Sequence, residues 1–190
     1  MNPIVINLFG APGAGKSTGA AYIFSQLKKM GYNVELVTEF AKDLVWDNNT
    51  SCLEDQIYVF AEQNHRLIRL KDKVDIIITD SPLILSCFYN KRTDLLLFEE
   101  FVKEIFNSYN NFNYFVERVK DYNPNGRLQT EAESDQYAIE ISDMLKSYHI
   151  PYSHILGIED GYDEVIKDII NTIDFGDLTL DEDEEESWLK

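Results

Sequence analysis

The stretch "FGAPGAGKST", close to the start of the chain, limits the possible folds more than any other part of the sequence. Gly10, Gly15, Lys16 and Ser17 meet the spacing G-x-x-x-x-G-K-[ST] of a phosphate-binding loop. Glycines permit turns in which successive backbone N–H groups point at one anion. Lys16 brings a compact positive charge to the outer phosphates, and the Ser17 hydroxyl is a ligand for Mg²⁺. The residues expected to hold the phosphates are Gly10, Gly13, Ala14, Gly15, Lys16, Ser17 and Thr18.

The surroundings of this loop are those that a phosphate-binding loop requires. Before it lies "PIVINLF", a β-branched apolar run of the length of a buried parallel strand. After it, Ala20, Ile23 and Leu27 repeat at the spacing of one helix face, and Gly31 is placed to end that helix. Strand, loop and helix follow in the required order. The sequence therefore predicts that the chain binds a nucleotide, ATP, together with Mg²⁺.

Strand and helix patterns alternate along the rest of the chain. Four further apolar runs, 33–38, 74–79, 112–117 and 152–156, read as strands. Helical spacing is found over 53–71, 98–109, 137–148 and 165–173. This alternation predicts an α/β fold: a doubly wound, mostly parallel five-stranded sheet with helices on both faces, as in P-loop NTPases. We expect one domain over residues 1–176, followed by a tail over residues 177–190.

Charge argues against several classes of partner. The 190-residue chain has a formal net charge of −17. Seven acids and one base lie from Asp177 onward, so that −11 remains on the domain. We expect the acidic tail to be solvated and disordered, and the acidic domain to disfavour nucleic acid as a partner. With no apolar run of membrane length and no C-x-x-C spacing between Cys52 and Cys87, the expectation is a cytoplasmic protein with reduced thiols.

Charged residues follow the predicted strands directly. In a sheet of this kind ligands bind beyond the carboxyl ends of the strands. Glu39 follows the second strand, Asp80 the third, and Arg118 the fourth. These side chains and the glycine loop are therefore expected at one rim.

Three classes of nucleotide-binding protein can be compared with this rim. A guanine-nucleotide switch needs N-K-x-D, but "NKRTD" places its acid one residue late, at Asp94. A motor usually ends its third strand in Asp-Glu, whereas Ser81 follows Asp80 here. A small kinase needs a lid that excludes water and an acceptor site. The kinase is the class that the remaining features favour.

Two segments are candidates for the lid and the acceptor site. Residues 118–130 carry Arg118 and Arg127 around a turn-forming "NPNG", which suits a lid that neutralises a transferring phosphoryl group. Thr130 and Glu133 have the spacing of a capping box for the helix that follows. On the helix over 53–71, three polar side chains are either ligands of the acceptor or a solvated flank: Gln56, Gln63 and Arg66.

Taken together, these motifs resemble the small P-loop nucleoside and nucleotide kinases. The similarity rests on "GAPGAGKST", on the acid in "TEFAKD", on the long Gln/Arg helix, on "IIITDSP" and on the lid near "YNPNGR". It looks closest to the ribosylnicotinamide-kinase domain of bifunctional NAD-biosynthesis regulators and to small bacteriophage P-loop proteins. The resemblance spans residues 4–173 and omits the tail.

The resemblance implies roles for the residues at the rim. ATP and Mg²⁺ would lie on the loop Gly10–Thr18, with Ser17 and Asp80 toward the metal. Asp80 would hold Mg²⁺ through water or polarise the acceptor hydroxyl, and Glu39 would be a base or a hydroxyl ligand. Arg118 and Arg127 would stabilise the transferred phosphoryl group. Ser81 stands where deoxynucleoside kinases usually have an arginine, which leaves the base and the substrate open.

The sequence therefore predicts an ATP- and Mg²⁺-dependent kinase of a nucleoside, nucleotide or related ribose-bearing small molecule. One alternative is a kinase of a hydroxymethylated base in phage DNA, against which the charge of −11 argues. Another is an ATP-gated binding module that is not a kinase, an interpretation that would give the acidic tail a role. The sequence sets no oligomeric state.

Overall fold

A single five-stranded sheet organises the molecule. The structure is a computed structural model that describes residues 2–123 and 129–185, with side chains described for 2–123 and 129–173. The strands are β1 (Ile4–Phe9), β2 (Val34–Val37), β3 (Ile76–Thr79), β4 (Asn110–Glu117) and β5 (Ser153–Leu156). Their order across the sheet is β2-β3-β1-β4-β5.

Every strand pairing in this sheet is parallel. β1 pairs with β3 on one side, where Val5 is opposite Ile77, and with β4 on the other, where Leu8 is opposite Tyr114. β2 and β5 complete the edges through β3 and β4. Parallel strands need crossover connections, and the helices that supply them bury both faces of the sheet. The predicted fold class is confirmed, and the sheet is parallel throughout.

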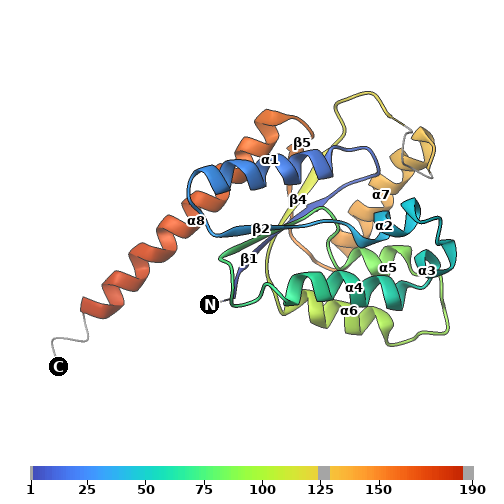
Figure 1. The fold of residues 1–190 in the computed structure, drawn as a ribbon, viewed down its shortest axis with the longest axis horizontal. Helices are drawn as coiled ribbons and strands as arrows, with labels where there is room; N and C mark the ends of the chain where they lie inside the picture. Colours follow the sequence, from blue (N-terminus) through green and yellow to red (C-terminus); the bar gives the residue numbers. More distant parts are fainter. Residues whose placement is uncertain (1, 124–128, 186–190) are drawn as a thin grey trace.

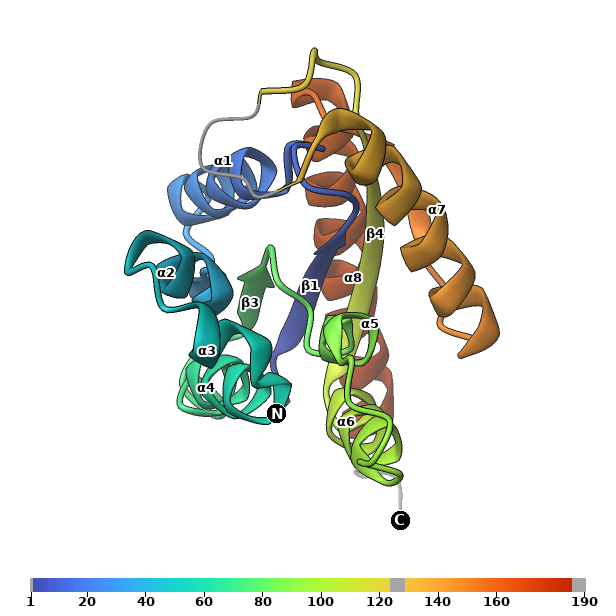
Figure 2. The same ribbon diagram turned by 90° about the vertical axis from the view of Figure 1, so that its right-hand side faces the viewer.

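Helices cover the sheet in two layers (Figures 1 and 2). One face carries α1 (Lys16–Lys29) and α8 (Glu159–Glu185), which lie side by side in Figure 1. The other face carries α4 (Gln56–Ile68), α5 (Leu85–Tyr89), α6 (Phe98–Asn107) and α7 (Glu131–Ser147). The short helices α2 (Phe40–Trp46) and α3 (Thr50–Glu54) join β2 to α4.

The alternation of side chains along each strand divides the core into two clusters. Ile6 and Leu8 of β1 face α1 and α8, where they pack with Ile23 and Val165. Val5 and Phe9 point the other way, toward α4, α6 and α7. Because β1 is buried on both faces, its residues are apolar in nearly unbroken succession, which is the pattern that marks a central parallel strand.

The helices differ from the sequence expectation in three places. The helix expected over 53–71 is two helices, because Asp55 leaves helical geometry (φ −83°, ψ 88°) and its carboxylate caps the N–H groups of Ile57 and Tyr58. The helices α2 and α5 were not predicted, since each is too short to show a clear period. The predicted capping box of α7, Thr130 with Glu133, is confirmed.

The acidic end of the chain overlaps the last helix. α8 continues to Glu185, so that it enters the segment expected as the tail, 177–190. The behaviour of that segment in solution stays a prediction. No helix within the described residues is both long enough and apolar enough to cross a membrane.

Candidate functional site

The ends of the strands bring the predicted site residues to one rim of the sheet. β1 is the central strand: β3 and β2 lie on one side of it, and β4 and β5 lie on the other. This is the topological switch point at which doubly wound sheets bind ligands. The phosphate loop follows β1, Asp80 follows β3, and Arg118 follows β4. Glu39 follows β2 and precedes α2.

The phosphate loop takes a shape that depends on glycine. Gly10, Gly13 and Gly15 have φ values of 133°, 85° and 104°, in the region that side chains disfavour. A Cβ on Gly10 would lie 2.6 Å from the carbonyl oxygen of Val116. Lys16 Nζ donates to the carbonyl oxygens of Gly10 (2.8 Å) and Ala11 (3.0 Å). The loop is therefore closed around its own lysine.

The first turn of α1 leaves its backbone N–H groups available to an anion. Gly15 is the N-cap and has no side chain with which to cap the helix. No acidic residue lies in this first turn. Uncapped N–H groups and the helix dipole both favour a negative charge here. The local geometry is that of a site for phosphate.

Ser17 and Asp80 form the part of the rim that fits Mg²⁺. The Ser17 hydroxyl donates to Asp80 Oδ2 at 2.5 Å. Asp80 is buried (6% exposed), and its Oδ1 has no hydrogen-bond partner among the described residues. A buried carboxylate oxygen without a partner is costly, and a cation would satisfy it. Among the described residues no three His, Cys, Asp or Glu side chains gather as a metal site. Two protein oxygens beside a phosphate site suit Mg²⁺, which keeps water and phosphate ligands.

Glu39 lies within the electrostatic influence of both loop and rim. Burial raises the pKa of its carboxyl, and the carboxylate of Asp80 raises that pKa further. The ammonium of Lys16 acts in the opposite direction and lowers it. Burial prevails, so the pKa of Glu39 is raised overall. A carboxyl group of this kind is suited to taking up a proton in a cleft.

The polar residues of α4 hold the chain on both sides of Glu39. Gln63 accepts a hydrogen bond from the N–H of Phe40 (2.9 Å) and donates to the carbonyl of Thr38 (3.4 Å). Arg66 donates to the same carbonyl (3.3 Å) and to Asp43 (2.5 Å). The amide of Gln63, which the sequence offered as a possible ligand of the phosphoryl acceptor, is thus hydrogen-bonded to the protein backbone. Gln63 and Arg66 position Glu39 in this structure.

Gln56 lies at the opposite end of α4 from Arg66. It is buried, and its amide donates to the carbonyl oxygen of Leu53 at 3.1 Å. This bond joins the start of α4 to the preceding helix α3. The three polar residues predicted on one helix are therefore placed in two different surroundings.

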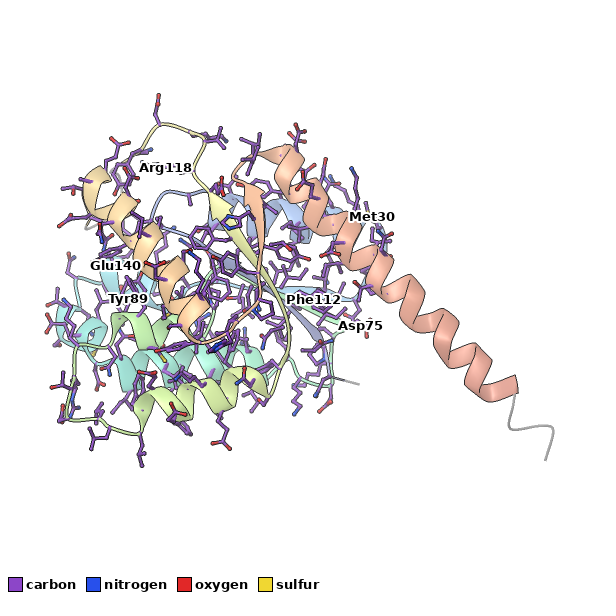
Figure 3. The ribbon with its side chains drawn as sticks, turned by 180° about the vertical axis from the view of Figure 1, so that it is seen from behind. Met30, Asp75, Tyr89, Phe112, Arg118 and Glu140 are labelled. Carbon is purple, nitrogen blue, oxygen red and sulfur yellow. The ribbon has the colours of Figure 1, made fainter. Side chains whose placement is uncertain are left out.

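Arg118 is held beside the phosphate loop by acids of α7. Its guanidinium pairs with Asp135 (2.5 Å) and Glu131 (3.2 Å), and Figure 3 shows Arg118 between the end of β4 and the start of α7. One of its nitrogens, Nη1, has no hydrogen-bond partner among the described residues. A cavity of about 230 Å³ lies between Arg118, the phosphate loop and α7. Arg127, the second predicted arginine, lies outside the described residues.

Tyr162 of α8 braces the phosphate loop, a role that the sequence did not suggest. Its hydroxyl donates to the carbonyl oxygen of Gly15 at 3.0 Å. Its ring occupies the space above Gly19, where a Cβ would lie 2.4 Å from a ring carbon. The one sequence signal is Gly19 itself, because a glycine inside a helix weakens it unless something packs there.

Aromatic rings of α5 and α7 pack against one another. Phe88 and Tyr89 of α5 have ring centroids 4.9 Å apart, and Phe88 lies 5.3 Å from Tyr137 of α7. Burial raises the pKa of Tyr89, and the charge of Glu39 raises it further. The sequence signal was "SCFY", in which the helical period was too short to read.

Comparison with known proteins gives a family and a fold. A family model described as "AAA domain" matches residues 5–160. A search of curated protein sequences found no match to the chain. Among solved structures, thymidylate kinase from Ehrlichia chaffeensis superimposes with a TM-score of 0.59 at 14% identity, over 89% of this chain and 99% of that one. Deoxyadenosine kinase from M. mycoides, solved with bound dATP, gives 0.55 at 20% identity, over 90% and 99%.

Proposed function

The chain belongs to the AAA domain family, and on this premise we propose that it is a P-loop kinase that transfers the γ-phosphoryl group of ATP to a nucleoside, a nucleotide or a related ribose-bearing small molecule. The observation that carries the proposal is the presence at one rim of a phosphate loop, the Ser17–Asp80 pair and Glu39 with its raised pKa. The similarity in fold to a thymidylate kinase and a deoxyadenosine kinase supports it.

Binding of the donor is assigned to the loop and its neighbours. The phosphates would be contacted by backbone N–H groups of the loop, including those of Gly13 and Ala14, and of the first turn of α1, including that of Thr18. Lys16 would exchange its bonds to Gly10 and Ala11 for phosphate oxygens. Ser17 and Asp80 would hold Mg²⁺, which supplies charge neutralisation to the β- and γ-phosphates when bound.

Transfer to a hydroxyl acceptor needs a base and a cation at the moving group. Glu39 would take the proton of the acceptor hydroxyl as that oxygen bonds to the γ-phosphorus, and the bond from phosphorus to the ADP oxygen breaks. The raised pKa makes the Glu39 carboxylate a stronger base toward the proton of the acceptor. Arg118 would leave the acids of α7 and neutralise charge on the phosphoryl group, as would Arg127 if the lid over 118–130 closes.

The acceptor would lie between Glu39 and the aromatic residues Tyr89 and Tyr137. Phosphorylation of a nicotinamide-type riboside, the narrower activity implied by the resemblance, remains a prediction within this class. The domain limits 1–176 and 177–190 are likewise proposed, the second as an acidic appendage outside the catalytic unit.

The experiment is a screen for ADP formation with Mg·ATP and a panel of ribo- and deoxynucleosides, their monophosphates and nicotinamide riboside. We expect one acceptor class to raise the rate at least about tenfold above the rate with water alone, which corresponds to about 1.4 kcal/mol of barrier. Lys16→Ala is the control and should abolish the acceleration. ATP that binds without acceleration by any acceptor would contradict the kinase and favour an ATP-gated binding module.

A further inference from the structure

A broad apolar groove lies away from the candidate site. It has a volume of about 780 Å³ and is bounded by α4, by α6 and by the segment that leads into α6. Figure 2 shows α4 and α6 at the lower end of the molecule, below the phosphate loop. The groove is thus separate from the rim where the nucleotide is proposed to bind.

One wall of the groove is a stripe along α4. Ile57, Ala61, Asn64 and Ile68 recur every three or four residues, so they share one helix face. Gln63 and Arg66 lie on the opposite face of α4, where they form hydrogen bonds with the backbone on either side of Glu39. Ile57 and Ile68 are exposed, although burying either side chain would be energetically favourable. A stripe of this spacing is suited to packing against another helix.

Two strongly exposed leucines belong to the lining of the groove. Leu96 and Leu97 precede α6 and are 84% and 78% exposed, more than any other large apolar side chain among the described residues. Phe101, one turn into α6, is also exposed and meets Phe60 edge to face. The groove and the most exposed leucines therefore share one face. In a two-fold dimer the same patch meets itself, so the leucines of each copy can enter the groove of the other.

The charge of the chain indicates which kind of partner would bind in the groove. The chain carries −17, so two copies repel each other over most of their surfaces. Among the described residues that line the groove, Asp94 is the one carboxylate, and Arg92 neutralises it at 2.6 Å. A basic protein or peptide would gain little at this neutral face and would be drawn to the acidic surface elsewhere. At this groove a second copy can form apolar contacts without bringing like charges together.

We propose that this groove is the interface of a homodimer, in which Leu96 and Leu97 of each copy pack against α4 and α6 of the other. The proposal is independent of the reaction that the rim performs. It makes a particular prediction about salt. Added salt screens the repulsion between two acidic chains and leaves apolar contacts in place, so association becomes tighter from about 0.05 M to about 0.5 M salt.

Sedimentation velocity of the full chain tests the interface. At about 100 µM and about 0.5 M salt, wild type should sediment with twice the 22.0 kDa mass of the chain. Leu97→Asp should raise the dissociation constant at least about tenfold, because it places a charge in an apolar contact. Leu97 is the N-cap of α6, a position that favours aspartate, so the variant is expected to fold.

Ile139→Asp is the matched control. Ile139 lies on α7, outside the groove, and is 58% exposed. The same change in charge there should leave the dimer intact. A wild-type chain that stays monomeric at high salt overturns the proposal, as does a dimer that Leu97→Asp leaves unchanged. Circular dichroism of each variant establishes that loss of the dimer is not loss of the fold.

Discussion

At the scale of single residues, the candidate site depends on carboxylates that the fold holds in unfavourable surroundings. Asp80 is buried with one oxygen unpaired among the described residues, and Glu39 has a raised pKa. Buried charges of this kind reduce stability unless a ligand compensates them. A cation and a proton-donating acceptor are the ligands that would do so. The free energy that the burial of these two carboxyl groups costs the folded chain is therefore the best sign that the rim is functional.

Replacing Glu39 by glutamine separates binding from chemistry. Glu39→Gln keeps the size and polarity of the side chain but removes the base, so phosphoryl transfer to a hydroxyl should fall about 100- to 10 000-fold. ATP affinity, measured by calorimetry with Mg²⁺, should stay within about twofold, or about 0.4 kcal/mol. Glu54→Gln, at an exposed position in α3, is the control and should leave both quantities unchanged. Undiminished transfer would remove Glu39 from its proposed role.

The raised pKa of Glu39 also predicts how stability depends on pH, and Glu39→Gln tests this dependence. The pKa of Glu39 is higher in the folded chain than the value of about 4.3 typical of an unfolded one. The folded chain then binds more protons in this interval, so the free energy of unfolding falls as pH rises from the unfolded pKa through the folded one. Glu39→Gln removes that loss, and the variant should be more stable than wild type at neutral pH.

Urea unfolding at neutral pH and at about pH 4 measures this difference. The gain should largely disappear at the lower pH, because the wild-type carboxyl is then protonated in the folded chain and mostly protonated in the unfolded one. A gain of equal size at both pH values would show that packing, and not the charge of Glu39, is responsible. The lower pH lies near the isoelectric point of about 4.4, so the comparison needs a low protein concentration.

At the scale of elements, the close contact between α1 and α8 fixes the phosphate loop. Tyr162 reaches the loop only because Gly19 leaves room for its ring. Gly157, before α8, likewise approaches the loop: a Cβ there would lie 2.2 Å from the carbonyl oxygen of Ala14. Two glycines outside the motif thus support the glycines within it.

Gly19→Ala tests this support through the sign of its effect. In an open helix this change stabilises by about 1 kcal/mol, because alanine favours the helix. Here the added methyl group overlaps the ring of Tyr162, so we expect a loss of about 1–3 kcal/mol in the free energy of unfolding. In a Tyr162→Leu background the loss should shrink, as a double-mutant cycle would record. A stabilising effect in wild type would contradict the close contact.

The elements also show what the sequence could and could not predict. The five strands and the rim residues Glu39, Asp80 and Arg118 were predictable, since a parallel sheet collects whatever follows its strands. The break at Asp55 was not, because an apolar period runs through it and only the cap geometry ends the helix. The role of Gln63 was not predictable either: an amide can bind a ligand or the backbone equally well, and only the turn at Phe40 decides between them.

At the scale of the whole molecule, the sheet order and the charge act together. The order β2-β3-β1-β4-β5 places the phosphate loop centrally and leaves α4 and α6 along one end. The net negative charge disfavours association between copies over most of the surface, and the apolar groove is a place among the described residues where charge is sparse. Position in the fold was needed to see this, because Ile57 is far from Leu96 and Phe101 in the sequence, and all three look like core residues in a one-dimensional pattern.

The most direct test of the central claim is the fate of the γ-phosphoryl group. Mg·ATP labelled at the γ-position is incubated with the full chain and the acceptor that most accelerates ADP formation, and the products are separated. The kinase predicts label covalently bound to the acceptor in amounts that match the ADP formed. Label recovered as inorganic phosphate would instead show that the acceptor stimulates hydrolysis, and phosphoryl transfer at this rim would be contradicted.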